Sequence, residues 1–186
     1  GGPQAGTPAE TFRNRLPSVA DTALITGASS GIGEHFARQL AHRGYELILV
    51  ARRADRLKKL ADELAVKAQV VTCDLGADAD QLPGQVSSIG AEVDLLVNNA
   101  GFGLRGRFAE LPAERQAELV RVNCEAVVIL TRAFVPAMIE RGRGGVITVA
   151  STAGMQPLPY EATYGASKAF ALNLTEALHM ELRDTG

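Results

Sequence analysis

The chain has 186 residues, which is enough for one domain with a sizeable core. Its content of 46% hydrophobic and 22% charged residues is that of an ordinary soluble globular protein. The net charge of −2 argues against a nucleic-acid-binding protein, which would need clustered Lys and Arg in excess.

Signals for the membrane and for secretion are weak in this sequence. We see no apolar run near the roughly 20 residues of a membrane span, and residues 1–20 lack the apolar core of a signal peptide. We expect residues 1–20 to be a flexible tail before a domain over residues 21–186. Cys73 and Cys124 lie in apolar stretches, as buried free thiols of a reducing compartment do. These features favour a cytoplasmic protein without membrane or nucleic-acid partners.

Short apolar runs alternate with amphipathic stretches along the chain. The runs are continuous, which is typical of parallel strands covered on both faces; they are residues 22–26, 46–51, 69–73, 93–97 and 145–150. Apolar residues recur at helical spacing in residues 32–42, 56–66, 112–138 and 163–182. Residues 78–89 are less clear because Pro83 and Gly84 interrupt them, and Pro136 is expected to kink or end the long helix. This order predicts an α/β fold with a doubly wound parallel sheet of the Rossmann type.

The alternation of strands and helices predicts a further strand after the last helix, where the chain reaches Gly186. We therefore expect the native protein to be longer, with C-terminal strands that this chain lacks.

A glycine-rich turn joins the first expected strand to the first helix. Its sequence is Thr26-Gly-Ala-Ser-Ser-Gly-Ile-Gly33. Glycines allow a tight turn and a close backbone approach, and the amide groups at a helix start suit a pyrophosphate. A turn made only for tight packing is the alternative. The strand–turn–helix context favours a dinucleotide site over residues Gly27, Ser29, Ser30, Gly31, Ile32 and Gly33.

Two arginines follow the second expected strand. A carboxylate at this place would hold a ribose 2′-hydroxyl, whereas an arginine accommodates a 2′-phosphate. Because Arg52 and Arg53 stand there and residues 50–53 contain no Asp or Glu, the sequence favours NADP over NAD. The alternative is that both arginines only solvate the start of the next helix. Asp74, after the third strand, can accept a hydrogen bond from an adenine amino group or be a simple turn residue.

Tyr164 and Lys168 lie four residues apart in the last expected helix, and therefore on one face. A phenol ordinarily ionises near pH ~10, and a nearby ammonium favours the phenolate. The pair is a candidate acid/base device, although the spacing alone is common. Ser151, at the end of the last apolar run, strengthens the hypothesis.

These motifs, taken in order, resemble the short-chain dehydrogenase/reductase family in its compact single-domain branch. The resemblance covers residues 22–183 and is carried by the glycine-rich turn, Cys73-Asp-Leu75, Asn98-Asn-Ala-Gly101, Asn123, Ser151 and Tyr164-x-x-x-Lys168. It implies an NADP(H)-dependent oxidoreductase that interconverts a carbonyl compound and an alcohol.

The resemblance also implies individual roles. Tyr164 would be the general acid/base, Lys168 would assist it and hydrogen-bond the nicotinamide ribose, and Ser151 would polarise the substrate carbonyl. Asn123 would hold a water that links Lys168 to solvent. The cofactor would also contact Leu75, Asn99, Ala100 and Gly101, with Arg52 at the 2′-phosphate.

Three further expectations concern substrate, partners and class of function. The proline-containing loop after Ser151 would contact an apolar carbonyl substrate through Met155, Gln156 and Leu158, or would be a stiff connector.

Apolar residues on several faces of the last two long helices, which build a dimer interface in the family, predict a homodimer or homotetramer. A non-catalytic NADP(H)-binding sensor or scaffold is the alternative function, because fold alone does not establish activity. A sugar-nucleotide epimerase is disfavoured by the glycine spacing and the length.

Overall fold

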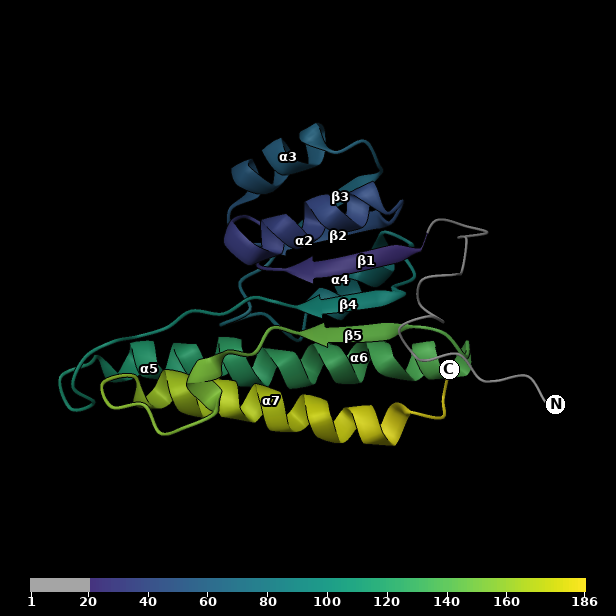
Figure 1. Ribbon diagram of the computed structural model, residues 1–186. Helices are drawn as coiled ribbons and strands as arrows, with labels where there is room; N and C mark the ends of the chain where they lie inside the picture. Colours follow the sequence, from purple (N-terminus) through teal and green to yellow (C-terminus); the bar gives the residue numbers. More distant parts are fainter. Residues whose placement is uncertain (1–20) are drawn as a thin grey trace.

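The computed structural model describes residues 21–186, which form a parallel sheet between helices (Figure 1). The expected tail over residues 1–20 lies outside the described residues. Five strands make up the sheet: β1 (Thr22–Thr26), β2 (Glu46–Ala51), β3 (Ala68–Thr72), β4 (Leu95–Asn98) and β5 (Gly145–Thr148). All the pairings are parallel, in the order β3-β2-β1-β4-β5. The predicted fold class is therefore confirmed, with strand ends that shift by one or two residues.

The strand order places the chain reversal between β1 and β4. The chain moves outward from β1 through β2 to β3, then returns to the other side of β1 for β4 and β5. In such open sheets a ligand crevice forms at the carboxyl ends of the strands, at the point where the order reverses. The topology thus determines where a site can form.

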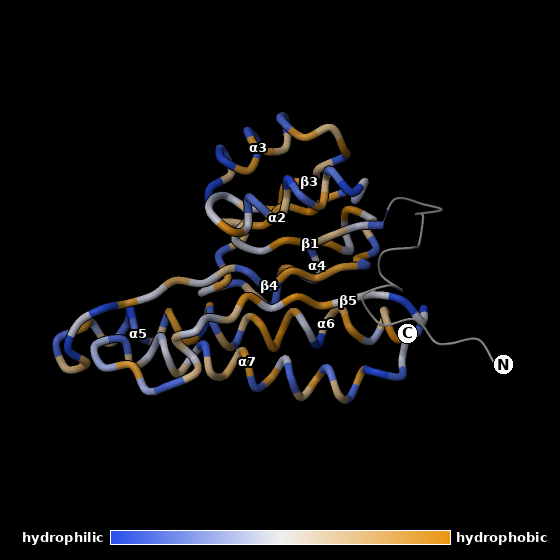
Figure 2. The backbone as a smooth tube through the Cα atoms, viewed as in Figure 1, coloured by the Kyte–Doolittle hydropathy of each residue, from blue (hydrophilic) through white to orange (hydrophobic). Residues whose placement is uncertain are grey.

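The core has two parts, one on each face of the sheet. Neighbouring residues of β1 face opposite sides: Ile25 packs with Ala37 and Leu57, and Leu24 packs in the cluster that contains Leu130. Continuous apolar strands are required because helices cover both faces, and β4 and α6 carry long hydrophobic stretches (Figure 2).

The helices largely match the predicted ranges. They are α2 (Gly31–His42), α3 (Ala54–Glu63), α4 (Leu82–Ser88), α5 (Ala113–Val120), η1 (Arg121–Glu125), α6 (Ala126–Glu140), η2 (Thr152–Gly154) and α7 (Ala162–Leu182). In the unclear region, Pro83 lies in the first turn of α4, where a missing N–H costs no helical hydrogen bond.

The long predicted helix is continuous but contains a π-helical turn. This turn, η1, separates α5 from α6, and nothing in the sequence pattern indicates it. Pro136 lies inside α6, which continues to Glu140, so the proline does not end the helix. The carbonyl of Arg132 loses its helical partner there, and Arg132 is exposed, where water can replace that partner.

One expectation about membrane spans is wrong. By length and composition alone, the continuous helix Ala113–Glu140 is long and apolar enough to cross a membrane. In this fold Ala126, Leu130 and Met138 of the helix belong to the core of the sheet. Packing against the sheet therefore accounts for part of the apolar character, while Val120, Val128 and Ile139 of the same helix are exposed.

Candidate functional site

A cavity of about 760 Å³ lies at the carboxyl edge of the sheet. Residues that follow each of the five strands line it, among them Gly27, Arg52, Asp74, Asn99 and Ser151. Because parallel strands end at one edge, segments far apart in the sequence meet there. Most of the predicted cofactor residues line this cavity; Gly31 and Gly33 do not.

The glycine-rich turn packs too tightly for larger residues. A Cβ on Gly33 would lie 2.4 Å from the carbonyl oxygen of Gly27 and 2.5 Å from Asn99 Nδ2. Gly31 has open space around it, but its φ of +59° favours glycine. The turn leads into the N-terminus of α2, whose N-cap Ser30 makes no side-chain capping bond. The helix start can therefore bind an anion.

Asn99 and Thr26 tie this turn to β4. Asn99 Nδ2 donates to the carbonyl of Thr26 at 2.8 Å. The buried Thr26 Oγ1 accepts from the backbone N–H groups of Asn99 at 3.0 Å and Ala100 at 2.9 Å. Asn99, which the sequence predicts as a cofactor contact, thus braces the turn, and Thr26, which the sequence analysis does not single out, supplies the acceptor.

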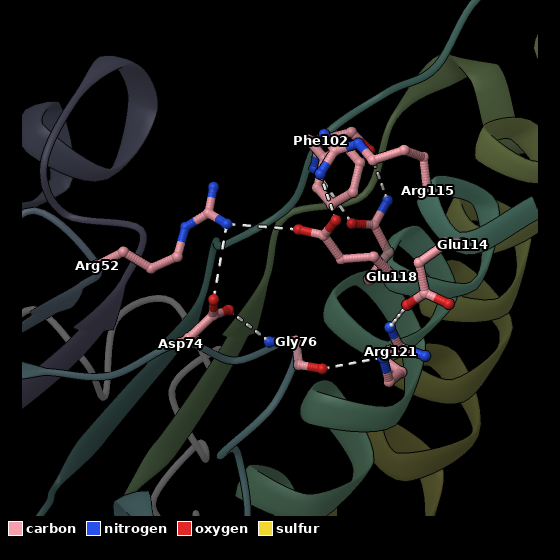
Figure 3. Close-up of polar contacts among 9 residues, drawn as sticks. Arg52, Asp74, Gly76, Phe102, Glu114, Arg115, Glu118 and Arg121 are labelled. Carbon is pink, nitrogen blue, oxygen red and sulfur yellow. Dashed lines mark hydrogen bonds and ion pairs between the residues drawn. The ribbon is translucent and has the colours of Figure 1, made fainter. Parts of the chain in front are cut away.

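The two arginines occupy one corner of the cavity. Arg53 Nη2 donates to both Ser29 Oγ and Ser30 Oγ at 3.1 Å, which joins it to the glycine-rich turn. Arg52 Nη1 lies 3.7 Å from Asp74 Oδ2 and 3.4 Å from Glu118 Oε1 (Figure 3). Both guanidinium groups are exposed at the end of β2, as a 2′-phosphate site would require.

Asp74 is engaged in the turn that follows β3. Its Oδ1 accepts from the backbone N–H of Gly76 at 2.9 Å, and Leu75 beside it is buried. The carboxylate therefore shapes a turn, and because Asp74 also lines the cavity, its contact with an adenine amino group stays a prediction.

Ser151, Tyr164 and Lys168 converge at the other end of the cavity. Ser151 follows β5 and its Oγ accepts from the backbone N–H of Ala153 at 3.1 Å. Lys168 Nζ donates to the carbonyl of Val149 at 2.7 Å and lies 6.0 Å from the centroid of the Tyr164 ring. Burial lowers the pKa of Lys168 from its ordinary value, because desolvation penalises the ammonium.

Asn123 lies in the π-helical turn and braces the loop after β4. Its Nδ2 donates to the carbonyl of Phe102 and to Ser167 Oγ, each at 3.0 Å, and its Oδ1 accepts from the N–H of Phe102 at 3.1 Å. The side chain is buried and is not part of the cavity wall. The predicted water-holding role stays a prediction. The π-helical turn fits a functional site, where such turns are frequent.

The three predicted substrate residues lie outside the cavity wall. Met155 and Gln156 are exposed and Leu158 is half-buried against Gly165. Their contact with a substrate therefore stays a prediction. Among residues 21–186, no group of three or more His, Cys, Asp or Glu side chains is arranged to hold a metal ion.

The sequence model of the short chain dehydrogenase family matches residues 21–186. The chain belongs to this family. A very-long-chain 3-oxoacyl-CoA reductase of Pyricularia oryzae is 37% identical over 174 residues, which cover 88% of this chain and 52% of the relative. The chain thus spans about half the length of the curated relatives it matches.

Solved structures of the family share the fold. A short-chain dehydrogenase from Sphingobium yanoikuyae in complex with NADPH superposes with a TM-score of 0.83 at 37% identity, covering 89% of this chain and 67% of that one. The bulky-bulky ketone specific alcohol dehydrogenase from Comamonas testosteroni has a TM-score of 0.82 at 35% identity, covering 89% and 69%.

The cavity of this family member fits a dinucleotide on its own geometry. A Cβ on Gly101 would lie 3.1 Å from Asn123 Oδ1 and 3.5 Å from Lys168 Nζ, so the glycine lets this part of the cavity wall pack closely on Asn123 and Lys168. The glycine-rich turn, the start of α2 and the two arginines supply donors for phosphates.

Sequence reasoning missed several residues that shape the site. Thr26, Val149 and Ser167 act through hydrogen bonds to other segments of the chain, and Glu118 reaches the cavity from α5. The motif spacing carries no signal for them, because their contacts join segments that are distant in the sequence.

Proposed function

We propose that this chain forms the cofactor-binding and catalytic core of an NADP(H)-dependent oxidoreductase that interconverts a carbonyl compound and an alcohol. One observation carries the proposal: a single cavity has Arg52 and Arg53 at one end and Ser151, Tyr164 and Lys168 at the other. The NADPH complex of a relative supports the cofactor.

The nicotinamide supplies or accepts the hydride when the cofactor is bound. The chain itself handles the oxygen of the substrate. Ser151 Oγ accepts the Ala153 N–H, which leaves its hydroxyl hydrogen to donate to a carbonyl oxygen. Tyr164 donates the proton that the developing alkoxide needs, and takes it back in the reverse direction.

Lys168 holds charge beside Tyr164. The carbonyl of Val149 orients its ammonium. Burial lowers the pKa of Lys168, so that this ammonium gives up a proton more readily than an exposed one. Asn123 keeps the loop of Phe102 and the helix of Ser167 in place beside them.

The substrate we propose is a carbonyl compound with a large apolar part. The relatives are named for 3-oxoacyl-CoA and for bulky ketones, and the exposed Met155 and half-buried Leu158 follow the Ser151 end of the cavity. We propose Met155, Gln156 and Leu158 as contacts to that apolar part.

We also propose that the protein is a cytoplasmic homodimer or homotetramer. Val120, Val128, Phe170 and Met180 remain exposed on α5, α6 and α7, and helices α5 and α7 pack side by side (Figure 1). Sedimentation equilibrium checks this, and a monomer at micromolar concentration contradicts it.

Tyr164→Phe tests the catalytic proposal. Turnover on ketone substrates should fall about 100-fold or more, because the phenolic proton is lost. The dissociation constant of NADPH, followed by fluorescence, should change less than twofold. Tyr45→Phe makes the same chemical change away from the cavity and should leave turnover unchanged.

Two results would redirect the proposal. If Tyr164→Phe keeps more than a tenth of wild-type turnover, the acid/base assignment is wrong. If the wild-type protein binds NADPH but turns over no carbonyl compound, the non-catalytic sensor or scaffold becomes the better function.

A further inference from the structure

Glu118 reaches from α5 into the corner of the cavity that holds Arg52. Its Oε1 lies 3.4 Å from Arg52 Nη1, although 66 residues separate the two in the sequence (Figure 3). The Glu118 side chain is only 17% exposed and lines the cavity. The Glu118 carboxylate is therefore already paired with Arg52, the cation that the proposed function assigns to a 2′-phosphate.

Glu118 also has a second cation, on its own helix. Its Oε2 accepts from Arg115 Nη1, one turn earlier in α5. The Arg115 guanidinium lies over the ring of Phe102, 4.8 Å from the ring centroid, which helps to hold it in place. Glu118 thus keeps a paired charge even when Arg52 leaves it.

Arg52 differs from its neighbour in what it must give up to bind a phosphate. Arg53 is held by the neutral hydroxyls of Ser29 and Ser30. Arg52 is flanked by two carboxylates, of which Glu118 is the nearer and Asp74 is also engaged with the Gly76 N–H. A phosphate dianion beside Arg52 meets like-charge repulsion from Glu118 and competes with it for the same donors.

We propose that Glu118 is an internal competitor of the 2′-phosphate for Arg52, and hence a residue that sets the preference between NADP and NAD. On cofactor binding, Arg52 moves from Glu118 to the phosphate, while Arg115 keeps Glu118 paired. A cofactor without the 2′-phosphate leaves the Arg52–Glu118 pair intact. This inference rests on the proposed function of Arg52.

The test uses two probes that differ only in the 2′-phosphate, adenosine 2′,5′-bisphosphate and 5′-AMP, titrated into the purified protein by calorimetry. Glu118→Gln should bind the bisphosphate about three- to fivefold tighter, as expected for the loss of one partly exposed competing carboxylate. Its affinity for 5′-AMP should change less than 1.5-fold. NADPH and NADH should follow the same pattern.

Glu114→Gln is the matched control. It removes the same charge from the same helix, but Glu114 pairs with Arg121 and not with Arg52. Both probes should bind this variant as they bind the wild type. An equal gain in bisphosphate affinity for Glu114→Gln would mean that net charge alone is responsible, which overturns the proposal.

Weaker bisphosphate binding by Glu118→Gln would also overturn the proposal, because Glu118 would then position Arg52 instead of competing for it.

Arg52→Gln separates this inference from the proposed function. If Arg52→Gln lowers the affinity for the bisphosphate but not for 5′-AMP, while Glu118→Gln has no selective effect, only the competition is wrong. If Arg52→Gln affects both probes equally, the 2′-phosphate assignment fails and this inference fails with it. In the double variant, the gain from Glu118→Gln should vanish.

Discussion

The glycine-rich side of the cavity and the side that holds Ser151, Tyr164 and Lys168, called the Ser151 side, are built in different ways. On the glycine-rich side, Ala23, Leu24 and Ile25 of β1 are completely buried. On the Ser151 side, every residue of β5 is half-buried, and only Gly165, Ser167, Lys168 and Ala171 of the 21 residues of α7 are buried. Within residues 21–186, the glycine-rich side is held by close packing, whereas the Ser151 side depends on a small number of hydrogen bonds.

The strand order explains this difference. β1 has β2 and β4 as neighbours and helices on both faces, while β5 lies at one edge of the sheet over residues 21–186. Lys168, Ser151 and Asn123 are each held by specific polar partners. Substitutions on the two sides should therefore differ in their balance between stability and chemistry.

The largest expected effect on stability is at Gly33. In Gly33→Ala the new Cβ would meet the backbone carbonyl of Gly27 and the amide of Asn99, which lie on the closely packed side and have little room to move. The free energy of unfolding should fall by about 3 kcal/mol, measured by urea denaturation.

Gly84→Ala is the control for this substitution. Gly84 lies in α4 with nothing within 4 Å of the added Cβ, so the variant should be unchanged or up to about 1 kcal/mol more stable. A Gly33→Ala variant as stable as Gly84→Ala would contradict the view that this side is held by close packing.

A smaller effect is expected at Thr26. Thr26→Val keeps the shape but leaves the Ala100 N–H without its acceptor, while the Asn99 N–H keeps only the carbonyl of Val97, so stability should fall by about 1–3 kcal/mol. The exposed Thr72 of β3 is the control, since Thr72→Val should stay within about 0.5 kcal/mol of the wild type. Equal values for both variants would show that the Thr26 hydroxyl does not brace the turn.

The smallest effect is a pH dependence that arises from Lys168. Burial lowers the pKa of Lys168 below its usual value of 10.5, so the folded chain releases this proton before the unfolded chain as the pH rises. The wild type should therefore gain stability relative to Lys168→Met between neutral pH and pH 10.5, and lose this gain as the pH falls. Urea denaturation at pH 7 and pH 10 measures it.

Lys58→Met serves as the comparison, because Lys58 is exposed on α3. Its stability difference from the wild type should be the same at both pH values. A Lys168→Met difference that is also independent of pH would mean that the Lys168 ammonium is not desolvated by the fold.

Much of the fold follows from local patterns in the sequence. Continuous apolar runs identify the five strands, because strands covered on both faces need no polar alternation. The glycine-rich turn and Arg52 lie next to such runs, so the carboxyl edge of the sheet brings them together. The π-helical turn around Asn123 could not be predicted, since it depends on packing between α5, α6 and α7.

The sequence by itself determined the succession of strands and helices along the chain, the family and the residue types of the site. Each of these depends on short-range spacing. Only the tertiary structure decided which groups share one cavity wall. It placed Glu118 against Arg52, the carbonyl of Val149 against Lys168, and Asn123 behind the wall. Those contacts join segments that are far apart in the chain, and their energies depend on distance and burial, which no local pattern records.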